Sequence, residues 1–301
     1  MAESMMWHDG ELIPYGEATI HVLSHAANRG SEVFDVLRVV DNGDGPAAIG
    51  LRPHVARFDQ SMHLMGMEPT CDIGSLEQAV AETVLANPGA TQVKLVAVWG
   101  EIPAGSRPLS RRPSLYVAAN PAYPLMLEPA EPVEVRTSTM PKIPATILPP
   151  GLKVAASYTA AIREQLLADA AGFDDVIFAT TDGWLAEATT QSVILVDDGR
   201  LLAPPLDSVL DGISRRLVLE LAHAEGWSVN VASIRWEQVA SADEAFFSST
   251  SAFVRSISRI DDDRYRAPGP IATRLVEVLQ AVARGEHELS ARWLTPLGPR
   301  G

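Results

Sequence analysis

A run of prolines near the middle of the chain, PAYPLMLEPAEPV at residues 121–133, is the feature that most limits how the chain folds. Its four prolines remove backbone donors and fix φ, which a helix or an inner strand does not tolerate. With 301 residues, the chain is also longer than one hydrophobic core usually serves. We therefore predict a smaller N-terminal α/β domain at residues 1–120, a linker at 121–133 and a larger domain at 134–301.

Both predicted domains mix helices and strands, which places the fold in the α+β class. Asp9-Gly10 lies between alternating flanks and predicts a hairpin turn. Apolar residues at helical spacing, with Pro or Gly stops, predict helices at 52–67, 75–89, 159–172, 212–226 and 270–286. Alternating or β-branched runs predict strands within 31–51, 91–101, 113–124, 133–139, 174–205 and 244–250.

The composition is that of a soluble globular protein, with 47% hydrophobic and 21% charged residues. A formal net charge of −14 disfavours nucleic acid and anionic membranes as partners. No apolar run approaches the roughly 20 residues that span a bilayer, and no secretory signal is evident. The single cysteine, Cys71, fits a reducing compartment, so we expect a cytoplasmic protein. The scattered histidines predict no metal site.

Two residues of the second half have unusual settings. Lys153 follows a Pro-Gly break in PPGLKVAASY and has small or apolar neighbours, a setting that lowers the pKa of an amine and makes it a nucleophile. A lone lysine of this kind is more often an ordinary one. Glu187 is an acid inside a largely apolar strand region, and a buried carboxylate needs a partner. A protonated ring nitrogen would serve, and so would an ordinary arginine. Tyr158 fits either a hydrogen bond to a cofactor or a place in the core.

Three other stretches suit an anion. In VLDGIS, Ile213 and Ser214 begin a helix whose N–H groups favour a phosphate, although Asp211 or Ser214 also suits a simple N-cap. Thr250 lies in the hydroxyl-rich FFSSTSA, and Arg57 follows a helical turn from which it reaches either an anion or solvent.

Taken in order, GLKVAASY, LAEATTQS, VLDGIS and FFSSTSA resemble the cofactor-binding segments of class IV aminotransferases, the fold-type IV pyridoxal-phosphate enzymes. The N-terminal IHVLSHAANRGSEVFDVLRV and LRPHVARFDQSM resemble the branched-chain aminotransferase branch of that family. The resemblance implies a two-domain fold whose larger domain binds the cofactor. It also implies a homodimer, with the active site between the domains and at the dimer interface.

The resemblance assigns a role to each matching residue. Lys153 would bind pyridoxal 5'-phosphate as a Schiff base and carry the proton in catalysis, and Glu187 would pair with the ring nitrogen. Tyr158 would contact the ring hydroxyl. The phosphate would be held by Arg57, Ile213, Ser214 and Thr250.

The substrate pocket departs from the branched-chain pattern. A tyrosine is replaced by Arg29, Tyr-x-Arg is replaced by Gln92 and Lys94, and the usual Gly-Glu-Asn is replaced by TTQS. A basic residue at position 29 resembles D-amino-acid or (R)-amine transaminases. The predicted substrate-binding residues are Arg29, Phe34, Arg38, Lys94, Arg107 and Ser251.

The prediction is therefore a ping-pong aminotransferase that uses an amino donor and a 2-oxo acid acceptor. Two alternatives remain open. One is a lyase of the aminodeoxychorismate lyase type, which would eliminate pyruvate without any acceptor. The other is a binding protein that has kept the fold but not the activity.

Overall fold

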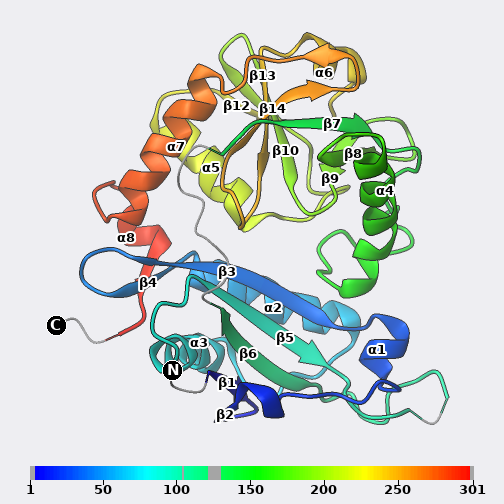
Figure 1. The fold of residues 1–301 in the computed structure, drawn as a ribbon, viewed down its shortest axis with the longest axis vertical. Coiled ribbons are helices and arrows are strands. Elements are labelled where there is room, and N and C mark those ends of the chain that lie inside the picture. Colours follow the sequence, from blue (N-terminus) through cyan, green and yellow to red (C-terminus); the bar gives the residue numbers. More distant parts are fainter. Residues whose placement is uncertain (1–3, 104, 121–129, 299–301) are drawn as a thin grey trace. The chain divides into compact units, whose positions relative to one another are not determined.

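The computed structural model describes residues 4–103, 105–120 and 130–298 (Figure 1). The chain forms two compact units. Unit 1 comprises Met1–Leu125, Leu152–Ala156 and Val282–Gly301, and unit 2 comprises Met126–Gly151 and Ser157–Ala281. Residues 121–129 of the predicted linker lie outside the described residues, and the rest of that linker runs into a strand that begins at Val133.

Unit 1 is built on an antiparallel sheet with the strand order β16-β4-β3-β5-β6-β1-β2 in the described part of the chain. Helices α2 and α3 pack against each other, α2 on β3 and α3 on β1 and β6. The strands are β1 Met5–His8, β2 Glu11–Pro14, β3 Val33–Asp41, β4 Pro46–Ile49, β5 Gln92–Val98, β6 Ser114–Asn120 and β16 Leu294–Pro296. The helices are η1 Tyr15–Glu17, α1 His25–Arg29, α2 Leu51–Met65, α3 Ile73–Ala86 and α8 Ser290–Trp293.

Local signals set several of these boundaries. Asp9 and Gly10 have φ angles of 45° and 112°, the left-handed values that the β1–β2 turn requires. At the end of α1, Gly30 has φ 62°, and a Cβ at this position would meet Ala156 at 3.3 Å. Glycine therefore allows α1 to end where the segment Leu152–Ala156 passes.

In unit 2, the described strands are ordered β12-β11-β10-β13-β14-β7-β8-β9, with β15 beside β14. An additional pairing of β9 with β10 closes β10, β13, β14, β7, β8 and β9 into a ring. The strands are β7 Val133–Thr137, β8 Asp175–Ala179, β9 Leu185–Ala188, β10 Ser192–Asp197, β11 Arg200–Ala203, β12 Val229–Val231, β13 Glu244–Ser248, β14 Arg255–Ile260 and β15 Asp263–Arg264. The helices are α4 Thr159–Ala170, α5 Ile213–Ala224 and α6 Trp236–Ser241. Two more helices, η2 Ala155–Tyr158 and α7 Pro270–Ala283, have residues in both units.

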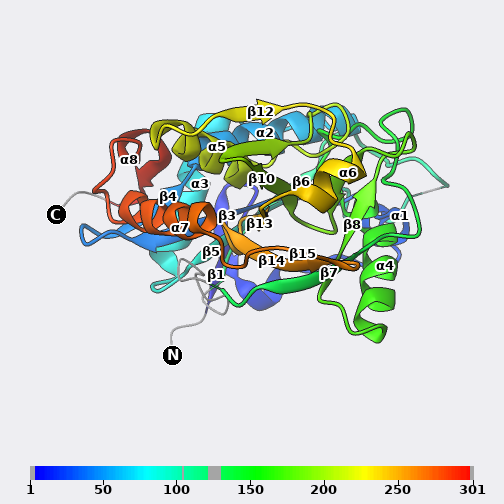
Figure 2. The same cartoon turned by 90° about the horizontal axis from the view of Figure 1, so that it is seen from above.

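The ring encloses a hydrophobic core. Ile177, Leu185, Val193, Phe247 and Ile257 come from different strands of the ring, and each is at most 1% exposed. Helix α4 packs outside the ring against β8 (Figure 2). The ring thus fixes the strand ends from which the polar residues of unit 2 project.

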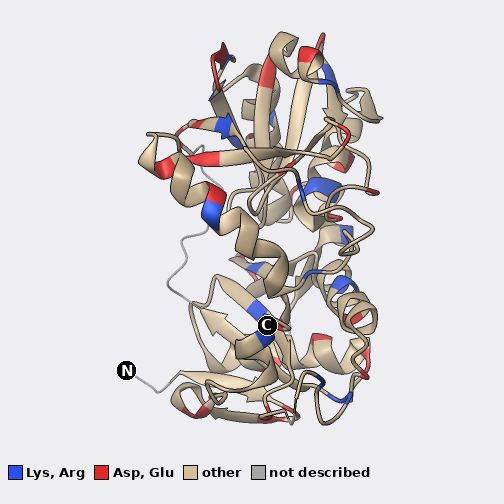
Figure 3. Cartoon of the chain, turned by 90° about the vertical axis from the view of Figure 1, so that its right-hand side faces the viewer, with Lys and Arg blue, Asp and Glu red and all other residues tan. Residues whose placement is uncertain are grey.

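Charged residues are distributed over both units, with basic positions scattered among acidic ones (Figure 3). None of the described helices is long and apolar enough to cross a membrane. Within the described ranges, no group of three or more His, Cys, Asp or Glu residues is placed to hold a metal ion.

The structure confirms the α+β class and the predicted helices and strands, with ends shifted by a few residues. It adds short elements that the sequence did not predict, namely η1, α1, η2, α6, α8, β12, β14, β15 and β16. Leu152–Ala156 and Val282–Gly301 belong to unit 1, whereas the sequence placed them in the domain 134–301. They belong there because Val154 bridges to Val33 and β16 pairs with β4, which are long-range contacts.

Candidate functional site

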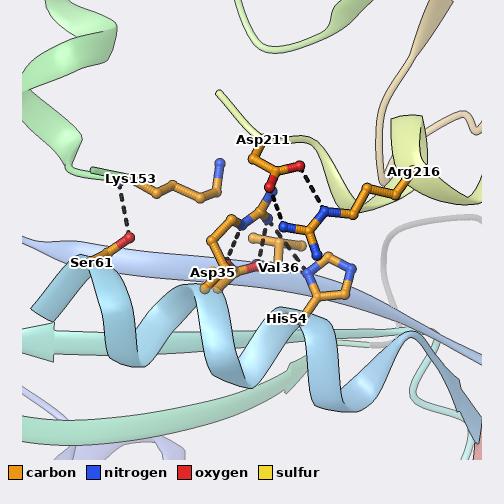
Figure 4. Close-up of polar contacts among 8 residues, drawn as sticks. Asp35, Val36, His54, Ser61, Lys153, Asp211 and Arg216 are labelled. Atoms are coloured by element: carbon orange, nitrogen blue, oxygen red, sulfur yellow. Dashed lines mark hydrogen bonds and ion pairs between the residues drawn. The ribbon is translucent and has the colours of Figure 1, made fainter. Parts of the chain in front are cut away.

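The backbone around Lys153 is held from two sides in unit 1. The Phe34 N–H donates to the Lys153 carbonyl at 3.2 Å, and the Ala155 N–H donates to the Glu32 carbonyl at 2.8 Å. On the other side, the Lys153 N–H donates to Ser61 Oγ of α2 at 3.1 Å (Figure 4). These hydrogen bonds fix the backbone of Lys153, and with it the position of the Lys153 Cα, although the residue lies outside every named helix and strand.

The Lys153 side chain is half-buried beside an aromatic ring. Its Nζ lies 4.6 Å from the centroid of Phe34, and Lys94 Nζ lies 4.9 Å from the same centroid. Lys94 Nζ also forms an ion pair with Glu32 at 2.7 Å. Phe34 is thus flanked by two lysines, and the charge of Lys94 is already balanced by a carboxylate.

Arg57 belongs to a buried polar cluster, which we call the Asp35 cluster and which consists of Asp35, His54 and Arg57. Arg57 Nε donates to Asp35 Oδ2 at 2.8 Å, and a second guanidinium nitrogen donates to Oδ1 at 2.8 Å. His54 Nδ1 lies 2.7 Å from Asp35 Oδ1 (Figure 4). The side chains of Asp35, His54 and Arg57 are 0%, 3% and 7% exposed.

The cluster has a defined charge state. Burial favours the neutral acid, but Arg57 and His54 hold the pKa of Asp35 well below its usual range. Burial lowers the pKa of His54, an effect that Asp35 opposes and that the positive charges of Arg57 and Lys153 reinforce. At neutral pH, His54 is therefore neutral and its Nδ1–H donates to Asp35. A carboxylate and a neutral imidazole thus hold the Arg57 guanidinium in one orientation.

In unit 2, Glu187 lies on β9 opposite Ser192 of β10, where the ring of strands closes. The residue is 7% exposed. Its Oε1 forms an ion pair with Lys142 Nζ at 2.6 Å, and its Oε2 accepts a hydrogen bond from the Leu210 N–H at 3.1 Å. The buried acid that the sequence singled out therefore has a cationic partner, a lysine that the sequence did not identify.

The start of α5 has no side-chain cap. Its N-cap residue is Gly212, and Asp211 is instead paired with Arg216, whose Nε donates to Oδ1 at 2.7 Å (Figure 4). The alternative that Asp211 or Ser214 caps this helix is therefore wrong. Ser214 Oγ is buried and has no hydrogen-bond partner among the described residues. A Cβ at position 212 would meet Ser192 Oγ at 2.8 Å, so a larger residue there would require the Ser192 hydroxyl to shift.

A hydrogen-bonded chain supports the loop after β13, which carries Thr250. Ser249 Oγ donates to Gln191 Oε1 at 3.2 Å, and Gln191 Nε2 donates to Asp175 Oδ2 at 3.1 Å. Thr189 Oγ1 donates to Asp175 Oδ1 at 2.7 Å. Burial raises the pKa of Asp175, so these donors are what keeps its carboxyl satisfied inside the unit. Thr189 and Gln191 belong to TTQS, the stretch that departs from the family pattern.

The structure divides the predicted site residues between the units. Unit 1 contains Lys153, Arg57, Arg29, Phe34, Arg38, Lys94 and Arg107, and unit 2 contains Tyr158, Glu187, Ile213, Ser214, Thr250 and Ser251.

Their burial differs as well. Arg29, Arg107 and Ser251 are exposed, and Tyr158 and Thr250 are half-buried. Arg38 is only 2% exposed, and its burial lowers its pKa. The place of Arg38 in the substrate site stays a prediction.

Sequence reasoning missed the partners of the assigned residues: Asp35, His54, Ser61 and Lys142. A helical signal existed for one of them, since His54 and Arg57 stand one turn apart on α2. The others meet their partners only through tertiary structure.

Comparisons with known proteins agree on one family. The family model described as amino-transferase class IV matches residues 32–260. The chain is 28% identical over 298 residues to a branched-chain-amino-acid aminotransferase of Pseudomonas aeruginosa, covering 97% of each chain. It is 27% identical over 298 residues to the corresponding Escherichia coli enzyme, covering 96% of each.

Solved structures show the same likeness. A branched-chain aminotransferase from Thermoproteus uzoniensis with norvaline has a TM-score of 0.92 and 29% identity, with 99% of this chain and 100% of that one covered. A branched-chain amino acid aminotransferase from Thermobaculum terrenum in its PLP form has a TM-score of 0.91 and 28% identity, with 98% and 99% covered.

Proposed function

The chain belongs to the class IV aminotransferase family, and we propose that it moves an amino group between an amino acid or amine and a 2-oxo acid by a ping-pong mechanism. The enzyme class is that of pyridoxal-phosphate-dependent transaminases, and pyridoxal 5'-phosphate is its cofactor. We propose that residues of both units serve one cofactor.

The observation that carries this proposal is the start of α5. The first-turn N–H groups of a helix favour an anion, and here neither Asp211 nor Ser214 satisfies them through a side chain. Ser214 Oγ is a buried donor without a partner among the described residues, and such a group is rare unless a ligand completes it. Ile213, Ser214 and Thr250 therefore fit a phosphate, and we propose that the Arg57 guanidinium, held in one orientation by Asp35, also donates to it.

Bound at these residues, the cofactor would supply an aldehyde that accepts an amine and a ring nitrogen that draws electrons from the reacting carbon. Lys153 would contribute the amine at Nζ and then carry a proton to and from the substrate Cα. Glu187 would hold the proton on the ring nitrogen through its carboxylate. Tyr158 would donate to the ring hydroxyl oxygen, and Phe34 would shield Lys153 Nζ from water.

For the substrate carboxylate, we propose Arg29, Arg107 or both. Each is exposed, and neither forms an ion pair with a carboxylate among the described residues. A guanidinium can grip a carboxylate with two parallel hydrogen bonds. Lys94 fits this role less well because Glu32 already balances it, and Ser251 is exposed near the proposed phosphate site. We propose that this pocket accepts D-amino acids or (R)-amines beside branched-chain amino acids, which the names of the relatives give as substrates.

We also propose a homodimer. Helix α4 buries Ala161, Glu164 and Ala168 but exposes Ile162, Leu166 and Leu167 to 56%, 65% and 44%. Exposed apolar side chains grouped on one helix are typical of a protein interface. Sedimentation equilibrium of Leu166→Glu against the wild type tests this, with a shift to monomer expected. A cytoplasmic location stays a prediction that rests on the single, unpaired Cys71.

The experiment that tests the function has two parts. First, borohydride reduction of the cofactor-loaded protein, followed by peptide mapping, should label Lys153, and labelling of another lysine would contradict the site. Second, the absorbance change on mixing with L-amino acids, D-amino acids and chiral amines should identify the donor. Release of pyruvate without a 2-oxo acid acceptor would indicate a lyase instead.

A further inference from the structure

The ion pair between Glu187 and Lys142 has no role in the function proposed above. Lys142 Nζ lies 2.6 Å from Glu187 Oε1, close enough for a charge-assisted hydrogen bond. Arg215 also lies within electrostatic reach of Glu187, but its own hydrogen bond goes to the Pro204 carbonyl at 2.8 Å. Among the described residues, Lys142 is thus the cation in direct contact with the acid.

We propose that Lys142 is a positioning residue that acts through Glu187. It balances the buried carboxylate before the cofactor is present and competes with the ring nitrogen for the same negative charge afterwards. This inference rests on the proposed function, which assigns Glu187 to the ring nitrogen. It predicts that Lys142 limits how tightly the protein binds pyridoxal phosphate.

The backbone shows that Lys142 is held beside the acid. The Lys142 N–H donates to the carbonyl of Ala179, the last residue of β8, at 2.8 Å. Ala179 pairs with Leu185 of β9, the strand that carries Glu187. The lysine is therefore attached to the strand next to the acid, and the contact between them follows from the fold.

Of the two partners, Lys142 is the one able to move. Its side chain is 24% exposed, whereas that of Glu187 is 9% exposed. The acid is fixed further by its strand and by the Leu210 N–H on Oε2. Loss of the ammonium therefore leaves the carboxylate in place but without its counter-charge, which is costly for a buried acid.

The geometry indicates that Lys142 competes with the ring nitrogen for the Glu187 carboxylate and does not strengthen the bond between them. A carboxylate has lone pairs for a further donor besides Lys142 and Leu210, so a protonated ring nitrogen has room to bind. Two cations on one carboxylate repel each other, and each weakens the hold of the other. Removal of the lysine charge should therefore strengthen the attraction between Glu187 and the ring nitrogen.

The test compares two cofactors in apo protein prepared by dialysis with an amino donor. One is pyridoxal 5'-phosphate, and the other is its 1-deaza analogue, which has a ring CH in place of the nitrogen. Fluorescence titration measures both affinities in the wild type, Lys142→Met, Lys142→Gln and Lys142→Arg. We expect Lys142→Met to raise the ratio of the two affinities about tenfold in favour of pyridoxal phosphate. Lys142→Gln should follow it, and Lys142→Arg should match the wild type.

Thermal unfolding supplies a second readout. Apo Lys142→Met should unfold at a lower temperature than the wild type, and saturating pyridoxal phosphate should close this gap while the deaza analogue leaves it. An unchanged affinity ratio in Lys142→Met and Lys142→Gln would overturn the inference and leave the proposed function standing. If the wild type itself does not prefer pyridoxal phosphate over the deaza analogue, Glu187 does not face the ring nitrogen, and both proposals fail.

Discussion

A buried polar cluster of unit 1 and the buried hydroxyls near the start of α5 in unit 2 are satisfied differently. In unit 1, both oxygens of Asp35 are matched by Arg57 and His54, and all of these side chains are at most 7% exposed. In unit 2, Ser214 Oγ and Ser248 Oγ are buried without a partner among the described residues. A completed cluster contributes to the stability of the apo fold, whereas an incomplete one contributes little until a ligand arrives.

The difference separates two kinds of site residue. The Asp35 cluster keeps Arg57 ready in one orientation, and its loss should appear as a loss of fold stability. The function proposed above assigns the α5 start and Glu187 to the cofactor, so their loss should appear in binding and turnover. Substitutions in each unit test whether this separation holds.

The largest effect is expected from Glu187→Gln in unit 2. The amide has no negative charge to hold the ring proton, and removal of one member of a buried charge pair costs several kcal/mol, which predicts a rate loss of at least about 10²–10³-fold. Single-turnover absorbance of the loaded variant measures the rate, and Glu277→Gln is a control because the Glu277 side chain on α7 is exposed. Near-wild-type turnover would mean that another acid faces the ring.

Asp35→Asn should be the strongest test of unit 1. The amide leaves the guanidinium of Arg57 buried with a neutral partner, which should destabilise the apo protein by about 3 kcal/mol or more. Asp41→Asn is the matched control, because Asp41 is the exposed last residue of the same strand and its side chain accepts a hydrogen bond from the Gly43 N–H. Urea unfolding measures the free energy of unfolding of both variants. Equal values would show that the Asp35 cluster contributes nothing to the stability of the apo protein.

A smaller effect is expected from pH through His54. Burial lowers the pKa of His54 in the folded protein, so below about pH 6.5 the unfolded chain binds a proton that the folded protein does not. Stability should therefore fall as pH drops below about 6.5, by up to about 1.4 kcal/mol per pH unit from this group. The depressed pKa of Asp35 acts at more acidic pH and does not enter this window.

His54→Gln should flatten that part of the stability profile. His63→Gln should leave it unchanged, because the His63 side chain on the same helix is 62% exposed. Urea midpoints measured between pH 5 and 7 provide the comparison. A slope that survives in His54→Gln would assign the pH dependence to another group.

The sequence predicts the helices, the strands and the candidate site residues, because each is marked by a short local pattern. It does not predict the partners of those residues, because most of these partners come from distant segments of the chain. Lys153, Glu187, Ser214 and Thr250 stand in short local motifs, and local order was enough to propose them as site residues. Arg57 was proposed in the same way, but its partner Asp35 lies 22 residues away, and their contact depends on how α2 lies on β3.

Two further contacts join segments that are distant in the sequence. Lys94, which we predict to bind a substrate carboxylate, forms an ion pair with Glu32, 62 residues away. The domain boundary at residue 134 could not account for Leu152–Ala156, which the chain returns to unit 1 beside β3. Pairings between distant segments are not encoded in periodicity, so the sequence gives the donors and acceptors but not their partners.

The smallest and most direct comparison uses two buried serines, one in each unit. Ser61 is 0% exposed, and its Oγ accepts the Lys153 N–H at 3.1 Å, so Ser61→Ala should cost the apo protein about 1–2 kcal/mol. Ser214 is 3% exposed, but its Oγ has no partner to lose among the described residues, so Ser214→Ala should change apo stability by less than about 0.5 kcal/mol. Its effect should appear instead as an affinity for pyridoxal phosphate that is weaker by about tenfold, because a hydrogen bond to a charged phosphate is lost.

Urea unfolding of the apo variants measures their stability, and fluorescence titration of the same samples measures their affinity for the cofactor. If Ser214→Ala destabilises the apo protein as much as Ser61→Ala and binds the cofactor normally, the hydroxyl at position 214 is part of the core, and the contrast between the two units does not hold.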